Sequence, residues 1–308
     1  MKRTLAAALA CLPLLWGTTA RAKLKIVCTI PDLCDIAANV GGDLVTTRTL
    51  GKGYQDPHFV DPKPSFALAL RSADLLMLVG LELEKGWLPR LITGARNSRI
   101  HKGGNGYLDC STVAKLREVP TTKISRSMGD LHPGGNPHYW MDPRNGVRIA
   151  YTTYKRLSKL DPGNRATYKR NYKRYALTII RYAKQAHKKL APYKGSYLIP
   201  YHQSMIYFIA WAGLRRLGTI ERLPGVPPSA AHLAKLHQII ASTPGRKVIV
   251  SETYYPATAA KRVASKFGLS YLQLAHMKGG LPSATTYLKM ITHNVDRVVA
   301  ALARSKAR

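Results

Sequence analysis

Cysteine, acidic residues and long apolar runs are all scarce in this sequence. Only 4 of the 308 residues are cysteine, too few for a fold built on disulfides. No apolar segment after the N-terminal leader is long enough to cross a bilayer as a helix. HExxH and CxxC-type spacings are also missing, which removes the usual sequence signs of a helical metalloprotease site and of a cysteine-based metal site.

The shortage of acidic residues gives the chain a strongly basic balance. Lys and Arg number 48 against 16 Asp and Glu, for a net charge of +32. Such a charge often indicates binding to nucleic acid or to an anionic membrane. Here the basic residues are spread over the whole chain and no nucleic-acid motif accompanies them. We therefore expect no nucleic-acid partner, and we relate the charge to an acidic medium or an anionic envelope surface.

Residues 1–22 read as an export signal. Lys2 and Arg3 precede an apolar stretch that is too short for a stable membrane anchor, and Ala20–Ala22 fits the small-x-small pattern of a signal-peptidase site. A lipid anchor on Cys11 is not expected, because apolar residues continue beyond it. The sequence predicts cleavage after Ala22 and a periplasmic protein. In that compartment Cys28 and Cys34 can pair, or they can be small buried apolar residues.

The remaining chain of about 285 residues is long enough for two domains. Strands alternate with helices in both halves, which predicts α/β domains with parallel sheets and helices on both faces. The expected strands are residues 24–30, 45–50, 75–79, 197–201, 247–251 and 270–274, and the expected helices of the first half are residues 31–40 and 64–72. The predicted division is an N-terminal domain at 23–161, a linking helix at 162–194 and a C-terminal domain at 195–308.

The linking segment has the pattern of one long amphipathic helix. Apolar residues recur at steps of three and four, with Lys and Arg on the opposite face, at Tyr168, Tyr172, Tyr175, Ile179, Ala183, Ala186 and Leu190. A helix of about 28 residues is about 40 Å long. Its position between two α/β halves predicts a rigid connection that runs along both domains.

Potential metal ligands follow the strands or turns of both halves. His58 and His138 each come after a proline, and each is followed by an aromatic residue and then an Asp-Pro pair. His202, Glu252 and His276 each come just after a predicted strand. The carboxyl ends of parallel strands are where such sheets place binding sites. A single histidine in such a loop is often structural, but candidates in both halves together favour a metal site.

The residue types indicate which metal to expect. Three imidazoles with one carboxylate, or four imidazoles, suit Zn²⁺, whereas Mn²⁺ prefers more oxygen ligands and is the second choice. We predict His132 as an accessory residue in a flexible loop. The remaining histidines occupy polar helices or loops and are expected to be solvated: His101, His187, His232, His237 and His293.

Several of these motifs resemble the zinc/manganese family of ABC-transporter solute-binding proteins. The resemblance covers essentially the whole mature chain, and its motifs are specific. The matching segments are Cys28–Leu33, Asp56–Ser65, Gly80–Trp87, Asn136–Trp140, Tyr201–Ser204 and Thr292–Asp296. It implies two α/β domains (Rossmann-like, with parallel sheets) joined by one long rigid helix, with a single metal in the cleft between them.

The resemblance also assigns ligands residue by residue. His58 and His138 match the two family ligands of the N-terminal domain, and His202 matches the first of the C-terminal domain. For the fourth ligand, Glu252 matches a characteristic family glutamate, while His276 stands where many members have aspartate. We favour Glu252 slightly, with both residues near the metal. The long histidine-rich loop of some zinc carriers is missing.

The function implied is that of a monomeric carrier, not an enzyme. It would capture Zn²⁺, or else Mn²⁺, outside the cytoplasmic membrane and pass it to an ABC permease. The alternative is a zinc hydrolase, whose metal keeps an open position for water and has a general base nearby. Four or five candidate ligands are enough to close the metal's shell, which favours the carrier.

Overall fold

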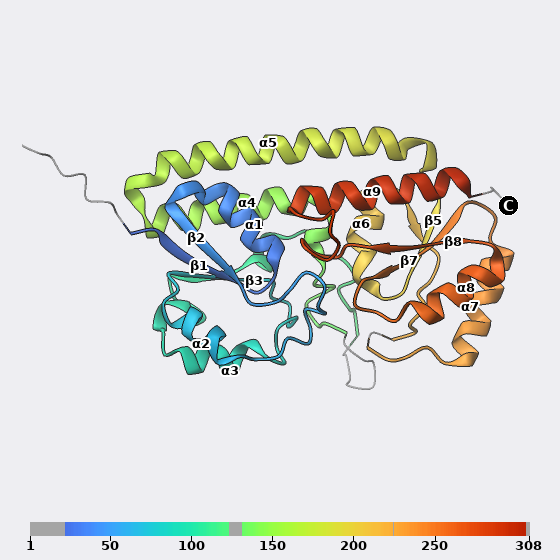
Figure 1. The fold of residues 1–308 in the computed structure, drawn as a ribbon, viewed down its shortest axis with the longest axis horizontal. Helices are drawn as coiled ribbons and strands as arrows, with labels where there is room; N and C mark the ends of the chain where they lie inside the picture. Colours follow the sequence, from blue (N-terminus) through green and yellow to red (C-terminus); the bar gives the residue numbers. More distant parts are fainter. Residues whose placement is uncertain (1–21, 123–130, 224, 306–308) are drawn as a thin grey trace, which may run out of the picture.

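The computed structural model describes residues 22–122, 131–223 and 225–305. The predicted signal segment lies outside these residues, except for Ala22. Figure 1 shows two α/β halves side by side, with one long helix, α5, lying along both. In the described part of the chain, no helix is both long and apolar enough to span a membrane.

The N-terminal half contains a four-stranded parallel sheet in the order β2-β1-β3-β4. Its strands are β1 (Leu24–Cys28), β2 (Val45–Thr49), β3 (Leu75–Leu78) and β4 (Tyr107–Asp109). The first three confirm the predicted strands, although each ends one or two residues earlier than expected. Strand β4 was not expected from the sequence, because three residues carry too short a pattern to separate from a loop.

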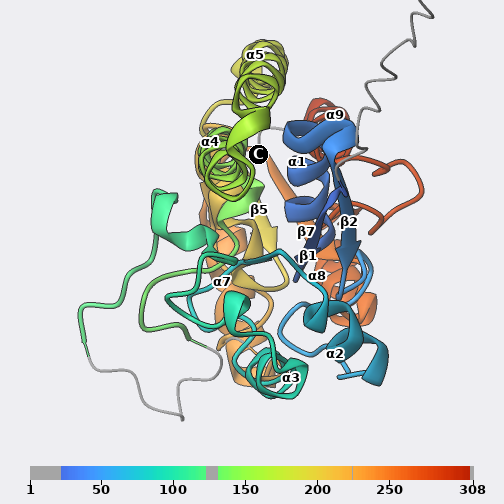
Figure 2. The ribbon, with the colours of Figure 1, turned by 90° about the vertical axis from the view of Figure 1, so that its left-hand side faces the viewer.

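Helices cover both faces of this sheet, as the alternation of strand residues requires. Ile26 and Met77 belong to a core shared with α1 (Pro31–Gly41) and α4 (Pro143–Leu160). Val27 and Leu76 point the other way, toward α2 (Pro64–Arg71) and α3 (Leu88–Ala95). Because strands buried on both faces need apolar residues throughout, they read as continuous hydrophobic runs. Figure 2 shows α2 and α3 at the end of the molecule away from α5.

The C-terminal half repeats this arrangement with strand order β6-β5-β7-β8. Its strands are β5 (Tyr197–Pro200), β6 (Arg215–Arg216), β7 (Lys247–Glu252) and β8 (Ser270–Leu274). One face packs with α6 (Ile206–Trp211) and α9 (Tyr287–Arg304), and the other with α7 (Ala230–Ser242) and α8 (Ala257–Phe267). Strand β7 runs one residue further than predicted, so Glu252 is its last residue.

Helix α5 (Arg165–Leu190) confirms the predicted linking helix. It begins three residues late, because Pro162–Asn164 form a separate 3₁₀ turn. Its buried face contacts α4 and α9, one from each half. A single apolar core also contains Met77 from β3 and Val250 from β7, so the two halves are packed together without a break. The exact domain limits stay a prediction.

A disulfide joins Cys28 at the end of β1 to Cys34 on α1, with 5.5 Å between the Cα atoms. The sequence left open whether Cys28 and Cys34 form a disulfide or are two separate buried thiols, and the structure has the disulfide. Cys110 is buried and unpaired. The disulfide fixes the turn from the first strand into the first helix, at the edge of the sheet where the candidate ligands gather.

Candidate metal centre

Three histidines from distant segments meet between the two sheets. His58 lies in the connection from β2 to α2, His138 just before α4, and His202 directly after β5. One ring nitrogen of each lies within 4.8 Å of the others. Their ring centroids are 5.3 Å (His58–His138), 5.9 Å (His58–His202) and 5.5 Å (His138–His202) apart. The three predicted ligands with the clearest motifs are thus brought together.

These imidazoles are almost completely removed from solvent. His138 is 1% exposed and His202 4% exposed, and the His58 side chain is 8% exposed. His138 Nδ1 is buried and has no hydrogen-bond partner among the described residues. A buried polar atom without a partner costs about 1–3 kcal/mol. A bound cation would remove that cost, so the site's own residues fit a metal.

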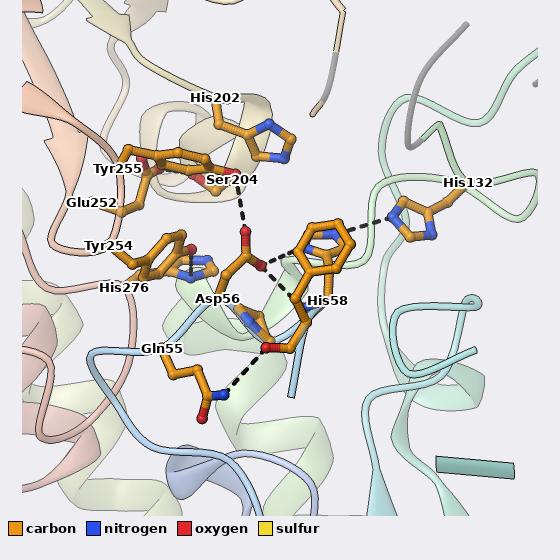
Figure 3. Close-up of polar contacts among 12 residues, drawn as sticks. Gln55, Asp56, His58, His132, His202, Ser204, Glu252, Tyr254, Tyr255 and His276 are labelled. Carbon is orange, nitrogen blue, oxygen red and sulfur yellow. Dashed lines mark hydrogen bonds and ion pairs between the residues drawn. The ribbon is translucent and has the colours of Figure 1, made fainter. Parts of the chain in front are cut away.

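Carboxylates orient two of the three rings. His58 Nδ1 donates to Asp56 Oδ1 at 2.7 Å, and His202 Nδ1 donates to Glu221 Oε2 at 2.8 Å. Because the proton of each neutral ring is then on Nδ1, Nε2 is left with a lone pair for a metal. Figure 3 shows Asp56 beside His58. Asp56 also accepts a hydrogen bond from Tyr255 Oη at 3.4 Å.

Neither orienting carboxylate was expected from the sequence. Asp56 stands two residues before His58, inside a motif that was noted for its histidine alone. Burial by itself would raise the pKa of Asp56, but the hydrogen bond and positive charge from His58 outweigh it and lower that pKa. Asp56 is therefore ionised, as an acceptor should be. Glu221 follows no recognisable pattern, since only the fold brings it to His202.

Glu252 and His276 also lie in this region, but outside the close group. Glu252 is fully buried, accepts a hydrogen bond from Ser204 Oγ and has its pKa raised well above the usual value by burial. His276 Nδ1 lies 2.6 Å from Tyr254 Oη (Figure 3), and its ring is 4.9 Å from that of His138. Burial lowers the pKa of His276 to about 3. Neither residue belongs to the described group within 4.8 Å.

His132, which was expected to be an accessory residue in a flexible loop, lies beside the three histidines. It is 8% exposed, and its Nε2 lies 3.3 Å from His58 Nε2 (Figure 3). Its Nδ1 donates to the Leu81 carbonyl at 2.7 Å. Burial, and then the nearby charge of His58, lower the pKa of His132 to about 3. The five histidines that were expected to be solvated are exposed or half-buried.

A small cavity adjoins these rings. It has a volume of about 30 Å³ and is lined in part by His132, His138 and His202. A cavity needs about 10–15 Å³ of such volume to hold one water molecule, so this one has room for a water-sized particle beside the rings.

Comparison with known proteins places the chain in a family. The sequence model of the family "ZnuA: Zinc-uptake complex component A periplasmic" matches residues 26–301. The chain belongs to this family. The resemblance seen in the sequence motifs is thereby confirmed.

Individual relatives agree with this family. The metal ABC transporter substrate-binding lipoprotein SloC of Streptococcus mutans is 29% identical over 176 residues, which are 56% of this chain and 54% of SloC. The chain thus spans about half the length of such relatives. The iron-binding protein YfeA of Yersinia pestis is 26% identical over 286 residues, 90% of this chain and 85% of YfeA. None of these named relatives is an enzyme, in agreement with the expected binding protein.

Solved structures support the fold. "Crystal structure of ZnuA" superposes with a TM-score of 0.75 at 24% identity, covering 91% of this chain and 99% of that one. FpvC from Pseudomonas aeruginosa in complex with Mn²⁺ gives a TM-score of 0.74, also at 24% identity and with 91% and 99% covered. At this identity the likeness shows a common fold. The relatives are named for zinc, manganese or iron, so they leave the metal of this chain open.

Proposed function

We propose that this chain is the extracytoplasmic binding protein of a metal ABC importer and that its cargo is Zn²⁺. The observation that carries the proposal is the group of three buried histidines with nitrogens within 4.8 Å of one another. Two of these rings are held by carboxylates, so their Nε2 atoms point unprotonated toward a common space. Membership of a zinc-uptake family supports the same function.

The proposed ligands are His58, His138 and His202, with Glu252 or His276 as the fourth by family resemblance. Mostly nitrogen ligands suit Zn²⁺ better than Mn²⁺, which ranks second. Zn²⁺ enters here as cargo: the ion is bound, carried and released. No observation on the described residues favours the hydrolase alternative.

The remaining parts of the proposal concern place and partners. Residues 1–22 would direct export to the periplasm, where a single copy of the chain would meet an ABC permease in the cytoplasmic membrane. The core that continues through both halves and the helix α5 along them oppose a wide hinge motion. We therefore expect metal release to need only a local rearrangement around the ligands.

The test is the metal content and metal affinity of the purified mature protein. We expect one tightly held zinc per chain, and zinc to outcompete manganese when the metal-free protein is titrated with both. His58→Ala should weaken zinc binding strongly, while His101→Ala, at an exposed histidine, should leave it unchanged. A chain without stoichiometric metal, or with binding indifferent to His58, would contradict the proposal.

A further inference from the structure

The solvent face of α5 carries charge of one sign only. The helix contains nine Lys and Arg residues and no Asp or Glu, and α4 beside it contains five Lys and Arg residues and no acid. All sixteen acidic residues of the chain therefore lie outside these two helices. The nine basic residues of α5 are all exposed: Arg165, Lys169, Arg170, Lys173, Arg174, Arg181, Lys184, Lys188 and Lys189.

Little in the surroundings of α5 offsets this charge. The helix α9 has a single acidic residue, which pairs with Lys189 at 2.6 Å. Within α5, Lys169 lies four residues before Lys173. The same spacing separates Arg170 from Arg174. Like charges at this spacing destabilise a helix. The row of cations thus opposes the helix that holds it, and a negatively charged partner would relieve the repulsion.

Two large apolar side chains lie within this basic row. Leu177 and Ile180 are each 53% exposed, and their spacing of three residues makes them neighbours on the helix surface. Arg174 and Arg181 flank them along the chain. Apolar side chains among basic ones are typical of helices that lie on an anionic bilayer, where they enter the layer of headgroups.

A groove adjoins the first residues of α5. It has a volume of about 410 Å³ and lies where α4 ends and α5 begins. Arg156 Nη1 donates to the Asn105 carbonyl oxygen at 2.7 Å, a bond that orients the guanidinium without neutralising it. The groove has the size of a small-molecule site, and its charge suits a phosphate group. None of its described lining residues is acidic, and four are basic: Lys155, Arg156, Lys159 and Arg165.

We propose that the face formed by α5 and the adjoining end of α4 binds the anionic surface of a lipid bilayer. The helix has 26 residues and is about 39 Å long, so its cations meet the partner along an extended row. Lipids can rearrange until a negative headgroup faces each cation, whereas the acids of a folded protein are fixed in position. The groove then takes one headgroup phosphate, and Leu177 and Ile180 enter the layer between headgroups.

Binding by this face leaves the candidate metal site free of lipid. None of the candidate ligands lies on α5, and α2 and α3 lie at the end of the molecule away from it (Figure 2). A chain held in this way stays beside the membrane and can still take up its ion. The inference rests on the proposed export of the chain and not on its metal site.

The experiment measures sedimentation of the purified mature chain with vesicles of phosphatidylcholine, made with or without phosphatidylglycerol. We expect binding only to the vesicles that contain the anionic lipid. This binding should be lost as salt rises from about 0.1 M to about 1 M, because the Debye length falls from about 10 Å to about 3 Å.

Two charge variants with the same net charge separate this face from the basic character of the whole chain. The test variant has Gln at four positions of α5: Lys169, Arg170, Lys173 and Arg174. The control has Gln at four exposed positions around α2 and α3: Lys63, Arg71, Arg90 and Lys102. One Lys or Arg near an anionic surface strengthens binding about fivefold. The test variant should therefore bind about 50-fold more weakly or worse, and the control should lose less than about fivefold. Because repulsion within α5 is removed, the test variant should melt at or above the wild-type temperature.

A fluorescent probe reports which face meets the lipid. Leu177→Trp places an indole on α5, and Leu68→Trp places one on α2 at a side chain that is 64% exposed. The native Trp87, Trp140 and Trp211 are buried and give a constant background. With the anionic vesicles, the emission of Leu177→Trp should shift to shorter wavelength, and that of Leu68→Trp should not.

Several results would overturn the proposal. These are equal losses in the two charge variants, equal binding to vesicles without phosphatidylglycerol, and an emission shift in Leu68→Trp instead of Leu177→Trp. A chain that ignores the vesicles and binds soluble polyglutamate through α5 would have an acidic protein as its partner, which also contradicts the proposal. None of these results changes the zinc titration, so failure of this inference and failure of the proposed function are distinguishable.

Discussion

At the scale of single residues, the site depends on which atom of each ring carries the proton. Asp56 and Glu221 accept from Nδ1 of His58 and His202, so Nε2 of each neutral ring is left as the atom that would bind the proposed metal. An imidazole without such a partner spends part of its time in the wrong tautomer or orientation. The carboxylates are therefore part of the candidate metal site, although they do not touch the ion in the proposed arrangement.

Removing one of these carboxylates should weaken metal binding without abolishing it. Glu221→Ala is expected to lower zinc affinity by about 10–100-fold, the usual cost of losing the outer partner of a ligand. Glu221→Gln should lose less, since its amide oxygen can still accept from His202. Asp296→Ala, at a surface carboxylate that pairs with Lys189, is the matched control. Equal affinities of Glu221→Ala and this control in a zinc titration would show that the contact does not support binding.

The candidate ligands are easier to recognise in the sequence than the residues that orient them. His58 and His138 stand in rigid Pro-His turns, and His202 follows a strongly apolar strand, so local pattern alone singles them out. Glu221 lies far from any motif and reaches His202 only because β5 and the connection after β6 are adjacent in the fold. His132 was placed in a flexible loop because its Gly-rich neighbours hide the contact with Leu81.

At the scale of elements, α5 is the clearest case of a pattern that predicted both structure and role. Its apolar residues at steps of three and four form the buried face, and its Lys and Arg residues face solvent. The helices α4 and α9 on which it packs were not among the helices expected from the sequence. Their positions come from tertiary packing that no local pattern specifies.

Adjacent residues of α5 offer a matched test of this packing. Ile179 is 1% exposed and Ile180 is 53% exposed. Ile179→Ala should lower the free energy of unfolding by about 2–5 kcal/mol, because it leaves a cavity in the core. Ile180→Ala should change it by no more than about 0.5 kcal/mol. Denaturant unfolding of the two variants measures both values, and similar losses would mean that α5 does not pack as described.

At the scale of the whole molecule, polar contacts connect the two halves beside the candidate metal site. Asp32 on α1 accepts from the backbone N–H of Lys278, with oxygens at 3.1 and 3.2 Å, and Lys278 Nζ pairs with Asp35 at 2.9 Å. Trp140 Nε1 donates to the His276 carbonyl at 2.9 Å. These contacts and the shared core explain why the halves should move little when metal is released.

Asp32 should make this connection sensitive to pH. Burial, its largest influence, raises the pKa of Asp32 from 3.8 to about 8. The folded protein therefore holds a proton that the unfolded chain releases, and the stabilisation is complete below pH 3.8 and lost as pH rises toward about 8. The free energy of unfolding of the metal-free wild type should fall between about pH 4 and about pH 8 more steeply than that of Asp32→Asn, which stays neutral.

The matched control for this pH dependence is Asp43→Asn, at an exposed aspartate of the same half. It should follow the wild-type profile, because its carboxyl meets water in both states. If Asp32→Asn also runs parallel to the wild type over this range, the buried proton on Asp32 does not exist.

The central claim is that one metal ion binds between the two halves, at His58, His138 and His202. Anomalous diffraction from crystals of the zinc-loaded protein, recorded on both sides of the zinc absorption edge, locates the ion directly. We expect a single strong peak at about 2.0–2.1 Å from one nitrogen of each of these histidines. A peak elsewhere on the chain, or no peak within reach of the three rings, would contradict the account.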